Sequence, residues 1–490
     1  MSAMAAQSKP FAGRRLHFVG IGGAGMSGLA LIAVKLGAAV TGSDNGNSSY
    51  LEPLRELGVE PLRGHAADNV PAGAEVVYSS AVGPDNPERA AGRSGGGELH
   101  RSELLAQIAS LKRCLAVSGA AGKTTVSAMA VQILRGCGMD PAYAIGGMLS
   151  STGSNADWGA GEWIVVEADE SDRSLLNYQP EVAILTNCEL DHHATYASRL
   201  ELEATFSQFL SGARTAVVWD RPELTVLAAG AGQIIPYDAT ASSLSPQGAS
   251  FRWRGFEVQL AVPGLHNAIN AAGALSACVA AGADPVAAVG AIGQFSGANR
   301  RMQKLGQAAC GAAVYDDYSH HPLKIRAALA AARTLAPQRL VVAFQPHLFS
   351  RTVELAGDFG RALAAADLCC VVDVYPAREL AADFPGVDGR LIAAATADAS
   401  GAATRYAAAA GGSGTADPLQ PHAADSPEHG CRVAWTPTFA DARKWLEANL
   451  RAGDICLVMG AGNIDELGRS LLSAAHGVSA AGGCNGVSGV

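Results

Sequence analysis

The sequence predicts an α/β protein of three domains, each built on a mainly parallel sheet. Two glycine-rich turns, near residues 20 and 119, each stand between a short apolar strand and a helical pattern. Short apolar strands separated by helical segments then return after residue 340. The length of 490 residues supports three domains, at roughly 150 residues per domain.

Composition and charge narrow the classes of protein to which the chain can belong. Hydrophobic residues make up 49% and charged residues 17%, which excludes a wholly disordered chain. The net charge of −9 argues against nucleic-acid binding, and the ten cysteines include no C-x-x-C pair that would predict a zinc site. The first fifteen residues lack an apolar signal region, and polar residues interrupt the uncharged stretch 262–283. We therefore expect a cytoplasmic protein without a membrane span.

The first predicted unit is a strand over 16–19, a helix over 26–36 and a strand over 38–41. A strand, a crossover helix and a second strand normally pair in parallel. We therefore expect a parallel sheet here, which a further apolar run at 76–79 extends.

The first glycine turn has the pattern of a dinucleotide-binding site. Gly20 to Gly25 satisfy G-x-G-x-x-G, and Asp44 follows Gly25 by nineteen positions, at the end of the next strand. Taken alone, this pattern favours an NAD-dependent oxidoreductase, and tight packing of helix on sheet without a ligand is the structural alternative. The diphosphate of a UDP-linked sugar fits the same turn, because a helix terminus does not recognise the rest of the molecule.

The second glycine turn, from Gly119 to Thr125, follows the apolar strand 115–117. It departs from a strict Walker A loop, because Val117 stands where that motif has its first glycine. The shortened loop still offers backbone N–H groups that cradle phosphates, Lys123 for the β- and γ-oxygens, and the Thr124 hydroxyl for Mg²⁺. A chance G-K-T on a surface turn is the alternative. A nicotinamide enzyme does not need this loop, so the two turns together indicate ATP and a second phosphorylated ligand.

Acidic residues follow the next two predicted strands. The strand 163–166 ends in the segment 167–172 with four carboxylates, and the strand 182–185 ends in the segment 186–193. Active sites of open parallel sheets form at such strand ends. Since Mg²⁺ prefers oxygen ligands, a carboxylate opposite the Thr124 hydroxyl would complete a metal site. A solvated loop is the alternative for a lone acidic cluster.

The last third of the chain repeats the alternation of strands and helices. Apolar runs at 340–344, 368–374, 431–435 and 455–459 predict another doubly wound sheet. Residues 394–430 are rich in alanine, glycine, serine and proline, which predicts a solvated insertion loop. The tail from about residue 474 has the same character.

The order of these motifs resembles that of the Mur ligases, from about residue 16 to residue 472. Each segment alone is of modest specificity, whereas the ordered set is highly specific. The segments that carry the resemblance are 17–28, 167–172, 264–270, 316–322, 344–347 and 460–464.

The resemblance implies a domain organisation and a reaction. The implied domains are a Rossmann-like N-terminal domain for the UDP-linked substrate, a central P-loop ATPase-like domain for ATP, a Rossmann-like C-terminal domain for the amino acid, and a flexible tail. Their implied bounds are 14–112, 113–302, 303–474 and 475–490. The implied reaction joins L-alanine to the lactyl carboxylate of UDP-N-acetylmuramate through an acyl phosphate, in peptidoglycan precursor synthesis. The implied cofactors are ATP and Mg²⁺, with Mn²⁺ as a substitute, and no nucleic acid or membrane partner is implied.

By motif match, the resemblance also implies roles for single residues. The implied catalytic residues are Lys123, Glu167, His192, His347 and Arg351. The implied metal ligands are Thr124, Glu167 and His192, although a histidine ligand goes against the preference of magnesium for oxygen. The implied ATP-binding residues are Gly119, Ala120, Ala121, Gly122, Lys123, Thr124, Thr125, Asn267, Asn270, Arg301 and Asp317. The implied contacts of the UDP-linked substrate are Gly22, Ala24, Gly25, Ser43, Asp44, Glu170 and Ser171. The implied amino-acid side is Tyr318, His320 and His321, and for His321 a structural hydrogen bond is the alternative.

The chain also departs from the usual pattern of the family. The family usually has Thr-His at the Ala120-Ala121 pair and commonly has arginine at Leu265 and Leu348. Losing a cation at Leu348 would cost ~2–3 kcal/mol of transition-state binding. These departures leave a weakly active, binding-only homologue as an alternative. A related amide ligase for muropeptides or folates is a second alternative, and an NAD-dependent oxidoreductase, which leaves Lys123 unexplained, is the third.

Overall fold

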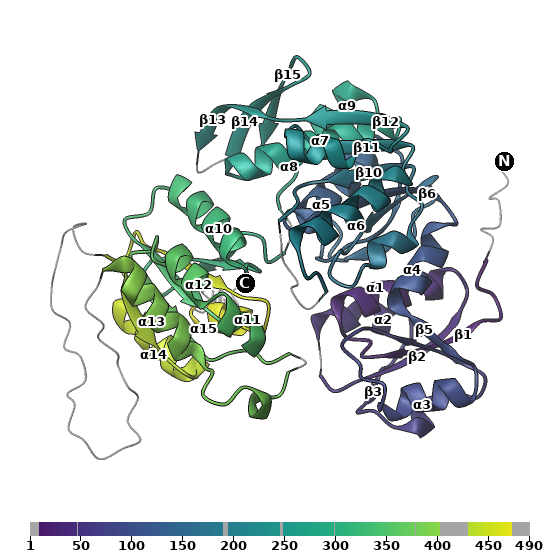
Figure 1. The fold of residues 1–490 in the computed structure, drawn as a ribbon, viewed down its shortest axis with the longest axis horizontal. Coiled ribbons are helices and arrows are strands. Elements are labelled where there is room, and N and C mark those ends of the chain that lie inside the picture. Colours follow the sequence, from purple (N-terminus) through teal and green to yellow (C-terminus); the bar gives the residue numbers. More distant parts are fainter. Residues whose placement is uncertain are drawn as a thin grey trace, which may run out of the picture. The chain divides into compact units, whose positions relative to one another are not determined.

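The computed structural model describes residues 9–46, 48–189, 195–245, 248–297, 299–377, 379–401 and 430–472. The chain divides into two compact units between Arg301 and Met302 (Figure 1). The predicted metal ligand His192, residues 402–429 of the predicted insertion and the predicted tail 475–490 lie outside the described residues. No helix in the described ranges combines the length and the apolar character that crossing a bilayer requires.

The first sheet of the N-terminal unit is wholly parallel, as predicted. Its strands, in spatial order, are β3 (Leu62–Arg63), β2 (Ala39–Asp44), β1 (Arg15–Val19), β4 (Glu75–Tyr78) and β5 (Glu98–His100). The associated helices are α1 (Ala24–Lys35), α2 (Glu52–Glu56), α3 (Pro87–Ser94) and α4 (Arg101–Ala109). The order 3-2-1-4-5 is that of a nucleotide-binding Rossmann sheet, so the turn after β1 lies at the carboxyl edge where ligands bind.

The second sheet of this unit carries the second glycine turn. Its strands, in spatial order, are β12 (Gln233–Tyr237), β11 (Thr215–Trp219), β10 (Val182–Leu185), β6 (Arg113–Ser118), β9 (Trp163–Glu167), β7 (Ala142–Ala144) and β8 (Ala156–Asp157). Only the β7–β8 pair is antiparallel among these neighbours. The helices are α5 (Lys123–Gly136), α6 (Arg199–Ser211), α7 (Pro222–Leu227), α8 (Leu265–Ala280) and α9 (Pro285–Ile292). Because helices cover both faces, residues 114–117 of β6 and all of β10 are continuous runs of buried apolar residues.

A small antiparallel sheet in the same unit was not predicted. It consists of β13 (Thr240–Ser245), β14 (Gly248–Trp253) and β15 (Phe256–Leu260). The indole N–H of Trp253 donates to Ser276 Oγ at 3.0 Å and so ties β14 to α8. Buried and exposed residues alternate along β15, and Ser250 and Arg252 interrupt the apolar residues of β14, so neither strand has a continuous apolar run in the sequence.

The C-terminal unit has one six-stranded sheet with helices on both faces. Its strands, in spatial order, are β16 (Gln303–Gln307), β17 (Ala313–Asp317), β21 (Ile455–Met459), β18 (Leu340–Phe344), β19 (Leu368–Val371) and β20 (Arg432–Trp435). Only β16 runs antiparallel to its neighbour. The helices are α10 (Pro322–Thr334), α11 (Phe349–Glu354), α12 (Ala356–Leu363), α13 (Gly389–Ser400), α14 (Phe439–Asn449) and α15 (Asp465–Ser470).

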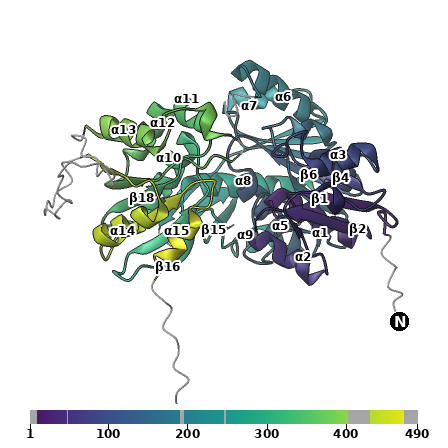
Figure 2. The ribbon, with the colours of Figure 1, turned by 90° about the horizontal axis from the view of Figure 1, so that it is seen from below.

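Two apolar cores in this unit lie on opposite faces of its sheet. Alternate residues of β18 enter each core: Leu340, Val342 and Phe344 pack with residues of α10, α12 and α13. Val341 and Ala343 pack with residues of α14 and α15. Figure 2 shows the two groups of helices on either side of β18.

The predicted insertion loop begins too early. Residues 394–400 form the end of α13 rather than a loop. Ile392, Ala393, Thr396 and Ala397 recur at helical spacing and are buried, so this alanine-rich stretch packs as a helix face. The prediction from composition alone was wrong for these residues, because alanine favours helices as well as low-complexity segments.

Candidate active site

The loop between β6 and α5 is shaped by two glycines with positive φ. Gly119 has φ +129° and Gly122, which caps α5, has φ +87°. A Cβ on Gly119 would stand 2.1 Å from Thr186 Oγ1, and one on Gly122 would stand 2.9 Å from Asn270 Oδ1. Only glycine fits both positions, and the first N–H groups of α5 are left for an anion.

Polar residues at the end of β10 hold this loop in place. Thr186 Oγ1 donates to the Ala121 carbonyl at 2.5 Å, and Asn187 Nδ2 donates to the same carbonyl at 2.8 Å. The Ala121 N–H donates to Asn187 Oδ1 at 3.0 Å. Since these bonds use only the backbone of Ala121, they do not depend on the histidine that the family usually has there. No role was predicted for Asn187 from the sequence, although its place directly after a parallel strand was a usable signal.

Lys123 lies among carboxylates at the start of α5. Its Nζ donates to the Gly119 carbonyl at 2.8 Å and to Glu170 Oε2 at 2.6 Å, and lies 3.7 Å from Asp169 Oδ1. Burial alone would lower the pKa of Lys123, but Glu170, Asp169 and Glu167 raise it above its ordinary value. Lys123 is therefore a permanent cation at neutral pH, positioned beside the loop that can cradle phosphates.

Thr124 and Glu167 form a compact group of oxygen atoms. Thr124 Oγ1 donates to Glu167 Oε1 at 3.2 Å, and the Gly146 N–H donates to Glu167 Oε2 at 2.8 Å. Arg301 Nη2 in turn donates to Thr124 Oγ1 at 3.2 Å. A Cβ on Gly146 would lie 2.6 Å from Glu167 Oε2, so the close approach needs glycine.

A carboxylate and a hydroxyl side by side fit magnesium, which prefers oxygen ligands and usually keeps water and phosphate ligands as well. In the ranges that the structure describes, no three His, Cys, Asp or Glu side chains gather as a metal cluster. A site for an ion held largely by phosphate oxygens does not require such a cluster.

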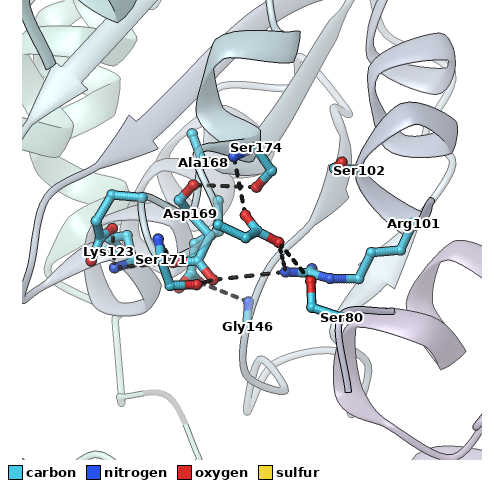
Figure 3. Close-up of polar contacts among 12 residues, drawn as sticks. Ser80, Arg101, Ser102, Lys123, Gly146, Ala168, Asp169, Ser171 and Ser174 are labelled. Carbon is cyan, nitrogen blue, oxygen red and sulfur yellow. Dashed lines mark hydrogen bonds and ion pairs between the residues drawn. The ribbon is translucent and has the colours of Figure 1, made fainter. Parts of the chain in front are cut away.

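The acidic loop, residues 168–172, follows β9 and contacts helices that belong to both sheets of the N-terminal unit (Figure 3). Ser171 binds Asp169 through both its N–H and its hydroxyl, at 3.2 and 2.9 Å. Arg101, the first residue of α4, reaches the same loop from the first sheet, and its Nη2 lies 3.7 Å from Asp169 and 3.5 Å from Asp172. Glu170 is 1% exposed and paired with Lys123. No role was predicted for Arg101 from the sequence, because no motif marks this residue.

The first glycine turn lies beside Asp44, as its spacing predicted. The Gly22 and Gly46 N–H groups donate to the two carboxylate oxygens of Asp44, both at 2.8 Å. The Ala24 carbonyl accepts a bond from Asn155 Nδ2 at 2.5 Å, which ties this turn to the second sheet. Gly25 lies near Arg101, since a Cβ there would be 3.4 Å from Nη1.

Ser43, a predicted substrate contact, lies in the interior and not at the surface, where a substrate contact would be expected. It is fully buried, and its hydroxyl donates to Glu88 Oε2 at 2.5 Å. The Ser43 hydroxyl is thus hydrogen-bonded to Glu88 beneath the carboxyl edge of the first sheet.

Of the two predicted ATP-binding asparagines of α8, only one lies against the glycine loop. Asn270 lies against Gly122 of the loop, whereas Asn267 Nδ2 donates to the Pro263 carbonyl at 2.7 Å. Leu265, where the family commonly has arginine, begins α8 and is 44% exposed.

In the C-terminal unit, predicted residues gather after β17. Asp317 accepts bonds from the Met302 N–H at 2.8 Å and the Ser319 N–H at 2.9 Å. The His320 ring packs edge-on against Tyr318, with centroids 5.1 Å apart. His321 caps α10 by accepting the Leu323 N–H at 3.4 Å, which supports its structural alternative.

His320 lies in a positively charged environment. Its ring centroid is 5.8 Å from that of His347, which in turn stacks on Tyr375. Burial, Lys324, Arg351 and His347 lower the pKa of His320 well below its usual range, so it is neutral at neutral pH. The neighbouring cations Lys324 and Arg351 suit an anionic ligand.

Leu348, which follows His347, has an unusual backbone conformation. It is buried at φ +71°, a conformation that costs a leucine about 1–3 kcal/mol. Its N–H donates to the Tyr375 carbonyl at 3.0 Å, which fixes the turn before α11.

Three family models match the chain in order. The Mur ligase family, catalytic domain, matches residues 15–113, and the Mur ligase middle domain matches residues 117–278. The Mur ligase, glutamate ligase domain, matches residues 300–462. Together they span most of the described residues.

Known proteins resemble the chain over nearly its whole length. It is 42% identical to a UDP-N-acetylmuramate–L-alanine ligase of Streptomyces coelicolor, over 94% of this chain and 98% of that protein. It is 39% identical to the protein of the same name from Renibacterium salmoninarum, over 94% of this chain and 96% of that protein. Among solved structures, UDP-N-acetylmuramate-alanine ligase from Thermotoga maritima matches with a TM-score of 0.76 and 26% identity, over 93% of this chain and 98% of that chain.

Proposed function

The chain belongs to the Mur ligase family, and we propose that it joins L-alanine to the lactyl carboxylate of UDP-N-acetylmuramate with hydrolysis of ATP. This reaction makes the chain an ATP-dependent carbon–nitrogen ligase that acts in the synthesis of peptidoglycan precursors. The observation that carries this proposal is the position of Lys123, which donates to the Gly119 carbonyl of the glycine loop and to Glu170 of the acidic loop. A UDP-N-acetylmuramate–L-alanine ligase aligns with 94% of the chain, which supports it.

The chemistry follows from the weakness of a carboxylate as an acyl donor. A carboxylate oxygen attacks the γ-phosphorus of ATP, ADP leaves, and the amine of L-alanine then attacks the acyl phosphate. Phosphate leaves from the tetrahedral intermediate with that same carboxylate oxygen. The protein has to offset the crowding of negative oxygens around the transferring group. Lys123 and the N–H groups of the loop would do this for the phosphates.

The oxygen pair of Thr124 and Glu167 would hold Mg²⁺, with His192 assigned to a second ion by motif match. When bound, the ion neutralises phosphate charge and orients the γ-phosphoryl group, and Mn²⁺ can replace it. Arg301, bonded to Thr124, would orient that hydroxyl. The ATP sites assigned to Asn267, Asn270 and Asp317 stay predictions.

We assign the three domains as the sequence predicted them, with bounds 14–112, 113–302 and 303–474. The first would take the UDP-linked substrate, the second ATP and the third the amino acid. In the third, the cations Lys324 and Arg351 near the neutral His320 ring support binding of the L-alanine carboxylate. A cytoplasmic location stays a prediction.

The test is release of phosphate from ATP in the presence of UDP-N-acetylmuramate, with and without L-alanine. We expect turnover that depends on L-alanine, that is lost in Lys123→Met, and that is retained in the control Lys444→Met, which changes an exposed lysine of α14. Turnover with a peptide or with glutamate in place of L-alanine would instead identify a muropeptide or folate ligase. A folded protein that binds both nucleotides without turnover would identify a binding-only homologue.

A further inference from the structure

Arg101 is held firmly at the start of α4. His100 caps this helix: Ser102 N–H donates to His100 Nδ1 at 3.4 Å, and His100 N–H donates to Glu103 Oε2 at 2.8 Å. This capping box fixes where the helix begins, so the Arg101 side chain leaves a rigid point at the carboxyl edge of the first sheet. Asn177, which follows the acidic loop, donates to Ser102 Oγ at 3.0 Å and ties the same helix to the second sheet.

The guanidinium of Arg101 lies between the two glycine turns. Its Nη1 lies near Gly25 of the first turn, and its Nη2 faces Asp169 and Asp172 of the acidic loop. Asp169 is shared, since its other oxygen lies 3.7 Å from Lys123 Nζ. In Figure 3, Lys123 and Arg101 approach this loop from opposite sides.

The contacts of Arg101 with the two aspartates are loose. Separations of 3.5 and 3.7 Å are ion-pair distances, longer than a charge-assisted hydrogen bond of about 2.7–2.9 Å. Both aspartates have further donors: Ser171 holds Asp169, and Ser80 Oγ donates to Asp172 at 3.3 Å. Arg101 can therefore exchange these partners for another carboxylate without leaving them unsatisfied.

Charge gives the reason for such an exchange. The substrate carboxylate has to approach a loop that carries Glu167, Asp169, Glu170 and Asp172, all of the same sign. Lys123 is required for phosphate oxygens, so a second cation has to offset this repulsion. A guanidinium is suited to that task because its planar fork binds carboxylates through two N–H groups.

We propose that Arg101 binds the lactyl carboxylate of the UDP-linked substrate and directs it toward the phosphoryl group beside Lys123. This inference rests on the proposed function and adds to it a residue that recognises the substrate carboxylate. The diphosphate would be left to the N–H groups of the first glycine turn.

The experiment compares two ligands by calorimetry: UDP-N-acetylmuramate, and UDP-N-acetylglucosamine, which has the same nucleotide and diphosphate but no lactyl carboxylate. The proteins are the unchanged chain, Arg101→Met, Arg101→Lys and the control Arg93→Met, which removes an exposed arginine of α3. We expect Arg101→Met to weaken UDP-N-acetylmuramate binding about 10- to 100-fold and to leave UDP-N-acetylglucosamine binding unchanged. Arg101→Lys should restore part of the loss, and the KM for ATP should not change.

Other outcomes overturn the inference. An equal loss for both ligands would assign Arg101 to the diphosphate, and no loss for either would leave it a structural ion pair. A misfolded Arg101→Met would show as loss of ATP binding, in which case Arg101→Lys decides by the same comparison. Failure of the proposed function is distinguishable, because the unchanged chain would then show no L-alanine-dependent turnover.

Discussion

Glu88 gives a prediction whose magnitude follows from the structure. This carboxylate of α3 is fully buried beneath the carboxyl edge of the first sheet and accepts bonds from Ser43 at 2.5 Å and Asn69 at 2.6 Å. His17 Nε2 lies 3.7 Å from Oε1, and His65 Nδ1 lies 3.2 Å from Oε2. Burial alone would raise the pKa of Glu88, but His17, Ser43 and Asn69 lower it from 4.5 to about 2.

A lowered pKa means that ionised Glu88 stabilises the folded domain above pH 4.5. That stabilisation is lost as the pH falls from about 4.5 to about 2, because the unfolded chain takes up the proton first. A shift of that size corresponds to about 3 kcal/mol. We therefore expect the opening free energy of the first sheet to fall by about 3 kcal/mol across this window, beyond the loss common to other carboxylates.

Hydrogen exchange read by mass spectrometry on peptides from β1, β2 and β4 measures this opening free energy. Glu88→Gln should be less stable at pH 6 and should lack the extra loss below pH 4.5. The matched control is Glu75→Gln, a half-exposed carboxylate of the same sheet paired with Arg14, for which we expect less than about 1 kcal/mol. Parallel pH profiles for the unchanged chain and Glu88→Gln would refute the reasoning.

Three further predictions concern the loop between β6 and α5, which we propose binds the phosphates of ATP. Glu167→Gln removes the charge beside the Thr124 hydroxyl and should lower kcat about 100-fold, with a weaker response to Mg²⁺ titration; an unchanged response would remove Glu167 from the metal site. Gly119→Ala places a Cβ against Thr186 at φ +129° and should weaken ATP binding about 100-fold or more in calorimetry while UDP-N-acetylmuramate still binds; normal ATP affinity would contradict the loop geometry. Asn187→Ala removes two bonds to the loop backbone and should raise the KM for ATP about tenfold, whereas a fall in kcat alone would speak against that role.

Most of the strands that the sequence predicted are buried on both faces, although β2, β4 and β20 were predicted and are only partly buried. In β10 every side chain is buried, so the apolar run itself marks the strand. The short strand β5 escapes prediction because Glu98 and His100 flank its one apolar residue, and pairing with β4 decides its conformation. The edge strand β13 is mostly exposed and has no apolar run to detect.

The candidate site also contains residues whose positions the sequence could predict and others whose positions it could not. Glu167 could be placed beside the loop because β6 and β9 pair in parallel, with Val117 opposite Glu167. Sequence spacing could not show that Ser43 turns inward to Glu88, since that contact depends on how α3 packs against the sheet. Nor could it show Arg101 beside Asp169, because Arg101 begins α4 of the first sheet and Asp169 follows β9 of the second, and they meet only through the packing of α4 against the segment after β9.

The origin of the released phosphate tests the central claim most directly. UDP-N-acetylmuramate labelled with ¹⁸O in its lactyl carboxylate is turned over with ATP and L-alanine, and the phosphate is analysed by mass spectrometry. Activation of that carboxylate by the γ-phosphoryl group predicts one ¹⁸O atom in each phosphate released, and no labelled phosphate from Lys123→Met. Unlabelled phosphate accompanying amide formation would show that the carboxylate never attacks the phosphorus, and would contradict the account.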